Sequence, residues 1–205
     1  RDITRAATLE ALAERARRVT GLVGRLVDEG GTAYDIAQIV AELNDRVVVR
    51  VLGLVAADLE EMGEDAPPVP YCWLAFGSEA RREQTLRTDQ DNGLVYADPP
   101  ADLAPRAAAY YARLAGDTIR ALVSLGVPAC EGDFMASNPR WCQPASTWAS
   151  YFRRWMDEPT PEQVLTACIF FDVRPVAGAC SRRAVSASAL QAPVQRVQVS
   201  SSPTA

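Results

Sequence analysis

The sequence predicts an α/β (α+β) fold in which a small mixed sheet is preceded by a helical pair. Two observations carry this prediction. The first 66 residues show sustained helical periodicity, and two short apolar runs bounded by turn residues follow between positions 71 and 96. The chain has 205 residues, of which 48% are hydrophobic. This is enough for one sizeable domain with a helical appendage and a packed core.

The predicted helical pair occupies residues 1–66, which we interpret as a linker to an upstream regulatory domain. Apolar residues recur at spacings of three and four between positions 9 and 27, which places them on one face of a helix. Gly30-Gly31 interrupts this pattern, and Thr32 with Asp35 resembles a capping box that begins a second helix. A short connection between the two helices predicts an antiparallel pair.

Residues 67–178 form the predicted core. The run Tyr71–Phe76 is short, rich in aromatic residues and followed by a glycine, which is typical of a buried strand. Gly93–Tyr96 predicts a second strand, because two prolines stop it shortly afterwards. Helical spacing over Pro105–Leu125 predicts a third long helix, which a glycine and a proline end.

The later part of the chain returns to helical spacing at Trp148–Met156, and Thr160-Pro161 resembles the beginning of a further helix. The apolar run Ile169–Arg174 then predicts a strand that Asp172 interrupts. Residues 179–205 contain no acidic residue and are dominated by Ser, Ala, Gln and Val. We expect a weakly ordered tail there, truncated or frameshifted relative to a complete domain.

Composition excludes several classes of function. A net charge of −5 argues against bulk nucleic acid as a partner, because such proteins usually carry a basic surface. The chain has no His, so His-based catalysis is excluded and carboxylates must carry any metal chemistry. All cationic side chains are Arg, so a cationic phosphate contact would use a guanidinium group.

The cysteines and the chain start bear on compartment and metal type. Five widely spaced cysteines suggest neither a zinc knuckle nor a disulfide framework, and we interpret them as buried, reduced and inert. No apolar run approaches the length of a membrane span, and the charged start is unlike a signal peptide. We therefore expect a cytoplasmic protein without a membrane partner.

A small-residue turn and a carboxylate pair form the pattern that carries chemistry. Gly77-Ser78 follows the first predicted strand, and Asp89 and Asp91 precede the second. Side chains alternate along extended backbone, so these two carboxylates are expected on the same face. Such a pair can hold Mg²⁺, which prefers oxygen ligands and keeps room for substrate phosphates. The glycine lets backbone approach a triphosphate, and nearby N–H groups and Ser78 can donate to its oxygens.

Gly-Ser followed after ten residues by Asp-x-Asp resembles the pattern of the DNA polymerase beta-like nucleotidyltransferase superfamily. The longer block GSEARREQTLRTDQDNGLVY is similar to signal-transduction nucleotidyltransferases found behind CBS domains, which are relatives of the PII uridylyltransferase. The similarity continues through GVPACEGDFMASNPRWCQ and IFFDVRPVAG and covers roughly Val19 to Gly178.

This resemblance implies a polymerase beta-like core and Mg²⁺-dependent transfer of a nucleotidyl group from a nucleoside triphosphate to an acceptor hydroxyl. The acceptor would lie on a regulatory protein, and a CBS-type domain would precede this chain. The resemblance assigns Asp89 and Asp91 to metal binding, and Asp172 to a third metal ligand or to activation of the attacking hydroxyl. It assigns nucleotide binding to Gly77, Ser78, Arg81 and Arg82, with Glu83 orienting an Arg.

Other interpretations of the same residues remain open at this point. Asp89 and Asp91 could lie in a solvated turn, and Asp172 could pair with Arg174. Arg81-Arg82 could lie on a solvated helix face. For function, the alternatives are a catalytically silent nucleotide sensor that changes contacts with a regulatory domain, and a purely structural domain without nucleotide binding.

Overall fold

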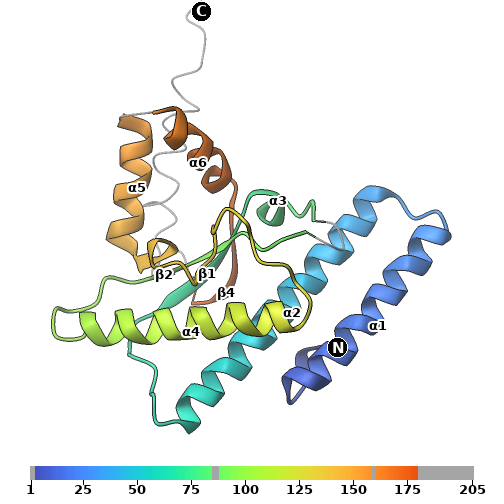
Figure 1. Ribbon diagram of the computed structural model, residues 1–205, viewed down its shortest axis with the longest axis horizontal. Coiled ribbons are helices and arrows are strands. Elements are labelled where there is room, and N and C mark those ends of the chain that lie inside the picture. Colours follow the sequence, from blue (N-terminus) through green and yellow to red (C-terminus); the bar gives the residue numbers. More distant parts are fainter. Residues whose placement is uncertain (1–2, 85–87, 158–159, 180–205) are drawn as a thin grey trace, which may run out of the picture.

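The computed structural model describes residues 3–84, 88–157 and 160–179, in which helices cover both faces of a four-stranded sheet (Figure 1). This combination confirms the predicted α/β (α+β) class. In chain order, the elements are η1 (Ile3–Arg5), α1 (Leu9–Asp28), α2 (Ala33–Glu61), β1 (Tyr71–Phe76), α3 (Gly77–Ala80), β2 (Asn92–Tyr96), α4 (Ala104–Ser124), η2 (Pro139–Trp141), β3 (Cys142–Pro144), α5 (Ala145–Asp157), α6 (Pro161–Phe171) and β4 (Val173–Gly178).

The sheet is mixed, with the strand order β3-β2-β1-β4. β1 pairs antiparallel with β2 on one side and with β4 on the other, and β3 runs parallel to β2 at the far edge. Because Tyr71 pairs with Tyr96 and Ala75 pairs with Asn92, the end of β1 lies beside the start of β2. The chain that follows β1 therefore begins between β2 and β4, which lie on either side of β1.

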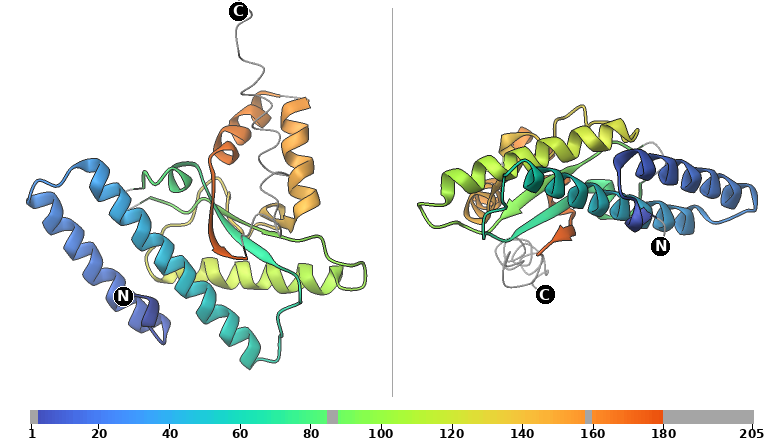
Figure 2. Two further views of the ribbon diagram at one scale, coloured as in Figure 1. Left: turned by 180° about the vertical axis from the view of Figure 1, so that it is seen from behind. Right: turned by 90° about the horizontal axis from the view of Figure 1, so that it is seen from below.

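The helical pair forms as the capping pattern predicts. Thr8 caps α1 by accepting a hydrogen bond from the Ala11 N–H, and Thr32 caps α2 by accepting one from the Asp35 N–H at 3.2 Å. The Thr32 hydroxyl also donates to the Asp35 carboxylate at 2.6 Å, which completes the side-chain contact of this cap. Gly30 ends the first helix with φ +83°, a conformation that glycine adopts at little cost. The two helices lie side by side in both views of Figure 2.

The helix α2 packs on the sheet and shares its hydrophobic core. Val51 and Leu59 of α2 are fully buried in one cluster with Tyr111 and Leu114 of α4 and with Trp73 of β1. The long helices α2 and α4 therefore cover one face of the sheet (Figure 2). Among the described residues, no helix combines the length and apolar character that crossing a membrane requires.

The other sheet face is covered by α5 and α6. Cys72, Leu74 and Phe76 alternate with Trp73 along β1 and belong to this second cluster. Because helices cover both faces, β1 is apolar at nearly every position instead of alternating with polar residues. Phe170 of α6 lies at the centre of the cluster, where it contacts the rings of Phe76, Phe134, Trp141, Trp148 and Trp155.

Two predicted elements differ from the structure. Residues 169–171 end α6, so the predicted strand across Asp172 is wrong, and β4 begins only at Val173. The helical conformation of this run places the Phe170 side chain in the aromatic cluster, and its burial there stabilises the helix. The short strand β3 (Cys142–Pro144) was not predicted, because it has no periodicity of its own and forms only by pairing with β2. Nearly all of the expected weakly ordered tail, residues 180–205, lies outside the described residues.

The cysteines differ from the expected buried, reduced set. Cys130, Cys142 and Cys168 are free thiols, but only Cys142 is buried and Cys168 is exposed. Cys72 is disulfide-bonded, so the expectation of reduced thiols is wrong at this position.

The adjacent residues Phe170 and Phe171 give a matched test of this core. Phe170 is fully buried, whereas Phe171 is 38% exposed. We expect Phe170→Ala to lower the free energy of unfolding by about 3–5 kcal/mol, because it leaves a cavity among the aromatic rings. Phe171→Ala should cost less than about 1 kcal/mol. Thermal unfolding of the two variants checks this, and equal losses would contradict the burial of Phe170 in the aromatic cluster.

Candidate functional site

The candidate site lies at the end of β1, where backbone from three segments meets. The Phe76 N–H donates to the Asp91 carbonyl oxygen at 2.9 Å, and the Gly77 N–H donates to the Asp172 carbonyl oxygen at 3.1 Å. Asp91 and Asp172, 81 positions apart in the printed numbering, are thus held on either side of the same turn. The strand pairing, rather than the local sequence, brings them together.

Gly77 adopts a backbone conformation that favours glycine. Its φ is +53°, in the left-handed region, and the position of its missing Cβ is 3.7 Å from Oδ2 of Asp91, an ordinary contact distance. The single helical turn α3 carries Ser78 directly after it. The Asp91 carboxylate and the backbone of the Gly77-Ser78 turn therefore border the same space.

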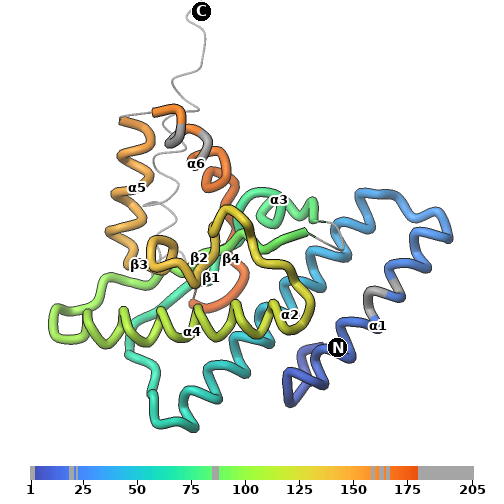
Figure 3. The backbone as a smooth tube through the Cα atoms, viewed as in Figure 1, coloured from blue at the N-terminus to red at the C-terminus, as the bar shows by residue number. Residues whose placement is uncertain are grey.

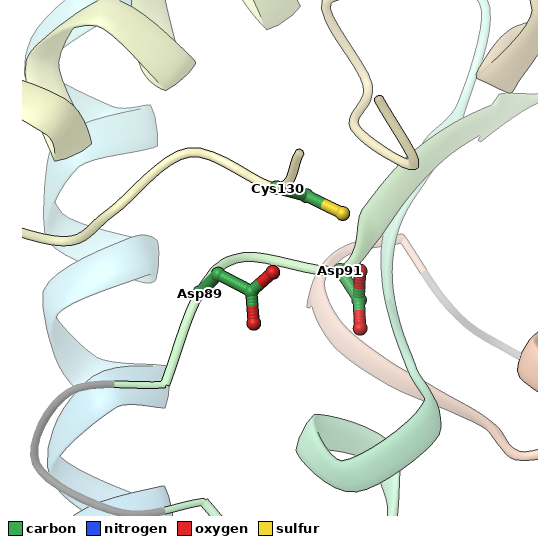
Figure 4. A group of neighbouring side chains, drawn as sticks. All are labelled: Asp89, Asp91 and Cys130. Carbon is green, nitrogen blue, oxygen red and sulfur yellow. The ribbon is translucent and has the colours of Figure 1, made fainter. Parts of the chain in front are cut away.

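Asp89, Asp91 and Cys130 form the cluster of ligand-type side chains at this turn. One carboxylate oxygen of each Asp and the Sγ of Cys130 all lie within 4.8 Å of one another. Figure 4 shows that the two carboxylates come from the segment before β2, whereas the sulfur comes from a separate loop. Both carboxylates lie outside β2, which begins at Asn92, so the alternation of side chains along a strand does not account for their proximity.

The residues that flank Asp91 fasten this loop to the sheet. The Gln90 backbone N–H and side-chain Nε2 donate to the carbonyl oxygens of Pro128 and Val127, at 3.2 and 3.3 Å. The Asn92 backbone N–H donates to the carbonyl oxygen of Phe134 at 2.9 Å. The Asn92 side-chain oxygen accepts a hydrogen bond from the backbone N–H of Ala136, also at 2.9 Å. Gln90 and Asn92 are each 2% exposed, so these contacts are shielded from water. Figure 3 follows this loop from the end of α4 back to the sheet.

The electrostatics of the cluster follow from its partial burial. Burial raises the pKa of Asp91; a hydrogen bond from the Cys130 thiol opposes the rise, and the negative charge of Asp89 adds to it. Burial raises the pKa of Cys130 to about 11, and the interaction with Asp91 contributes to that rise. Two carboxylates and a thiol are therefore crowded where a bound cation would relieve the repulsion.

Asp172 is paired with Arg81 instead of Arg174. The Arg81 guanidinium contacts the Asp172 carboxylate through Nη1 and the Glu83 carboxylate through Nε, the latter at 2.8 Å. These side chains are exposed at the surface, with 44% exposure for Arg81 and 40% for Asp172 in this pair. Asp172 does not belong to the cluster of potential metal ligands that the described residues form.

Arg174 and Arg82 face helix α2. Arg174 forms a two-pronged contact with the Asp45 carboxylate, at 2.7 and 2.9 Å, so the suggested pairing with Asp172 is wrong. It also donates to the carbonyl oxygens of Glu79 and Ala80, which fixes α3 against α2. The Arg82 guanidinium is 3.8 Å from Asp45 and follows α3 with φ 59°, so it does not lie on a helix face.

Glu79 is a buried carboxyl beneath the turn. It is 6% exposed, and burial raises its pKa to about 8, with a further rise from the charge of Asp45. Arg174 and a hydrogen bond from the Asp91 backbone N–H act in the opposite direction. Glu79 lines a cavity of about 20 Å³, which has room for one or two water molecules. The carboxyl thus links the Gly77-Ser78 turn to the backbone of Asp91.

Comparison with known families decides the relationship of this chain. Residues 17–162 match the family described as "Putative nucleotidyltransferase DUF294". The chain belongs to this family. A comparison with curated proteins finds no match. The matched region of this nucleotidyltransferase family includes the Gly77-Ser78 turn, Asp89, Asp91 and Cys130, and it ends before Asp172.

Sequence reasoning missed two groups at this site. Cys130 was interpreted as inert, because no spacing rule relates it to a carboxylate pair some forty residues earlier. Glu79 was not singled out, although it directly follows the Gly77-Ser78 turn, because nothing local shows that its side chain is buried.

The raised pKa of Glu79 predicts a pH-dependent stability. In the unfolded chain this group titrates near 4.5, whereas in the folded protein it titrates near 8. As the pH rises from about 5 to 8, the unfolded state loses its proton first, so the folded state is progressively disfavoured. Glu79→Gln removes this effect but keeps an oxygen that can accept from the Asp91 N–H.

We therefore expect the melting temperature of Glu79→Gln, relative to the unsubstituted protein, to increase as the pH rises from 5 to 8 and to level off above about 9. Thermal unfolding across this range measures the difference. The exposed carboxylate variant Glu83→Gln is the control and should show a flat difference. A flat difference for Glu79→Gln as well would contradict the buried, proton-binding state of Glu79.

Proposed function

We propose that this protein transfers a nucleotidyl group from a nucleoside triphosphate to an acceptor hydroxyl, with a divalent cation held by Asp89 and Asp91. The observation that carries the proposal is the convergence of these two carboxylates beside the Gly77-Ser78 turn in a chain of a nucleotidyltransferase family. A solvated turn would not need the buried amides on both sides of Asp91.

The residues of the cluster fit a divalent cation such as Mg²⁺. Neighbouring ligands on one ion, each about 2.0–2.3 Å from it, are about 3–3.7 Å apart. The ligand atoms here lie within 4.8 Å of one another, so side-chain rotations would have to bring them closer together around an ion. Asp89 and Asp91 supply the hard oxygen ligands that Mg²⁺ prefers and leave positions for phosphate oxygens. When bound, the ion neutralises charge on the triphosphate and orients it for in-line attack.

The turn and Arg81 supply the contacts to phosphate in this proposal. Gly77 has no side chain between its backbone and the space beside Asp91, and Ser78 adds a hydroxyl donor. Arg81 is exposed and is held by surface ion pairs, which are worth about 0–1 kcal/mol, so it can exchange Asp172 for a phosphate. Arg82 is a less suitable candidate, because its guanidinium lies near the carboxylates of α2.

Asp172 would then be free to act on the acceptor. Its backbone is fixed beside Gly77, so its carboxylate needs only a side-chain rotation to face the turn. In the proposed step, the acceptor oxygen forms a bond to the α-phosphorus while the bond from that phosphorus to the pyrophosphate oxygen breaks. Asp172 takes the proton of the acceptor hydroxyl, and pyrophosphate leaves. A role for Asp172 as a third cation ligand is the alternative use of the same position.

The acceptor in this proposal is a hydroxyl on a regulatory protein, and a CBS-type domain would lie upstream in the full-length protein. Both suggestions rest on the resemblance of the sequence block around the Gly77-Ser78 turn. The net charge of −5 favours a protein acceptor over a nucleic acid, which the acidic surface would repel.

A catalytically silent nucleotide sensor is the second candidate function. The pairing of Asp172 with Arg81 favours it, because this pair leaves only two carboxylates in the cluster of ligand-type side chains. A sensor would bind nucleotide and cation as the transferase does, but it would release no pyrophosphate.

Asp89→Asn and Asp91→Asn test the proposed cation site. In the unsubstituted protein, a nucleoside triphosphate at about 100 times its Kd should stabilise the fold by about 2.7 kcal/mol when Mg²⁺ is present. For a chain of this size, this corresponds to an increase in melting temperature of about 5–10 °C. Each substitution should abolish the Mg²⁺-dependent part of this increase.

Asp102→Asn is the matched control, because Asp102 is an exposed carboxylate in the turn before α4. It should keep the full thermal shift. A shift that persists in both site variants, or no shift with any nucleoside triphosphate, would contradict the proposal. Pyrophosphate release in the presence of candidate acceptors then separates a transferase from a sensor.

A further inference from the structure

The proposed reaction leaves one member of the cluster without a role. Cys130 is a free, partly exposed thiol, and its Sγ belongs to the same 4.8 Å group as the carboxylate oxygens of Asp89 and Asp91. Figure 4 shows Cys130 on a loop beside the segment that carries the two carboxylates. Sulfur in this position is a ligand type that the carboxylate pair lacks.

The placement of Cys130 is built into the fold. Its loop is attached to the sheet by the buried side chains of Gln90 and Asn92, which stand on either side of Asp91. The Cys130 carbonyl accepts from the Asp133 N–H at 3.1 Å, and its own N–H contacts the Met135 sulfur at 3.4 Å. Four residues thus fix the backbone around Cys130 and Asp91, so their side chains meet as a consequence of these loop contacts.

Gly132 leaves room for the Phe134 ring in the loop that carries Cys130. A Cβ at Gly132 would lie 2.7 Å from the Phe134 ring and 3.6 Å from the Cys130 Sγ. The glycine therefore lets Phe134 pack over the turn, where its ring contacts Trp141 and Phe170 of the aromatic cluster. The loop that carries Cys130 is anchored in the core as well as along the strand.

We propose that Cys130 is a third protein ligand of the cation held by Asp89 and Asp91, and that its sulfur makes the site select Zn²⁺-type cations over Mg²⁺. The inference rests on the proposed cation-dependent function and refines the kind of cation. On binding, the sulfur forms a bond to the cation and the thiol proton passes to solvent. Two carboxylates and one thiolate are three protein ligands, which leaves an open position for a phosphate oxygen.

The selectivity follows from ligand softness. Thiolate ligands favour zinc and softer metals, whereas Mg²⁺ takes oxygen ligands almost exclusively. Cys130→Ser is therefore an informative substitution, because it exchanges sulfur for oxygen with little change in shape. It should lower the ratio of Cd²⁺ affinity to Mg²⁺ affinity by at least about 100-fold, more than is typical for the loss of an outer contact.

The test is a titration of the full chain with Cd²⁺, which gives an ultraviolet charge-transfer band when a thiolate binds it. The band should appear in the unsubstituted protein and in Cys168→Ser, which removes the exposed free thiol of α6. It should be lost in Cys130→Ser and strongly weakened in the double variant Asp89→Asn/Asp91→Asn. Cys130→Ala repeats the comparison if the serine variant is not folded, as circular dichroism would show.

Each outcome bears on the proposal separately from the transfer reaction. A band that remains in Cys130→Ser, or that is unchanged when both carboxylates are replaced, overturns the three-ligand site. A nucleotide-induced thermal shift with Mg²⁺, together with no Cys130-dependent band, would leave the proposed function standing and remove this inference. A Cys130-dependent band without any nucleotide-induced thermal shift would support the three-ligand site and contradict the proposed nucleotidyl transfer.

Discussion

Backbone pairing at the end of β1 holds the candidate site together. Phe76 donates to the carbonyl of Asp91 on one side, and Gly77 donates to the carbonyl of Asp172 on the other. Because β1 lies between β2 and β4, any group that follows it is flanked by both neighbours. Helices on both faces shield these hydrogen bonds from water, which makes leaving them unpaired costly. The position of every proposed functional side chain depends on this one arrangement.

Polar side chains beneath the Gly77-Ser78 turn connect the end of β1 to the helices α2 and α3. Arg174 joins Asp45 of α2 to the carbonyls of α3, and Glu79 joins α3 to the backbone of Asp91. The Arg174–Asp45 pair is partly buried, and desolvation offsets part of its attraction. Its two-pronged contact contributes to the orientation of α2 relative to the turn. The helix α2 is thereby tied both to the hydrophobic core and to the site.

The cluster of Asp89, Asp91 and Cys130 combines ligands that different cations prefer. The carboxylates suit Mg²⁺, and the sulfur suits zinc-type ions. Family membership supports nucleotidyl transfer in general terms. The cation and the acceptor belong to the proposals above.

The sequence by itself determined the elements whose signals are local. Threonine caps and three-and-four periodicity predicted α1 and α2, and the spacing of Asp89 and Asp91 singled out a carboxylate pair whose ligand atoms the structure places close together. Such signals depend on neighbours within a few residues, so the sequence contains them completely. The apolar run before Asp172 was ambiguous, because a buried helix end and a buried strand have the same composition.

Only the tertiary structure decided which distant groups meet. The partner of Asp172, the burial of Glu79 and the approach of Cys130 to the carboxylates depend on strand order and on hydrogen bonds across more than thirty residues. No periodicity records such contacts, because their energy comes from pairing and packing between elements rather than within one. The sequence therefore determined the fold class and singled out the carboxylate pair, whereas the folded chain decided that the Cys130 thiol lies beside it.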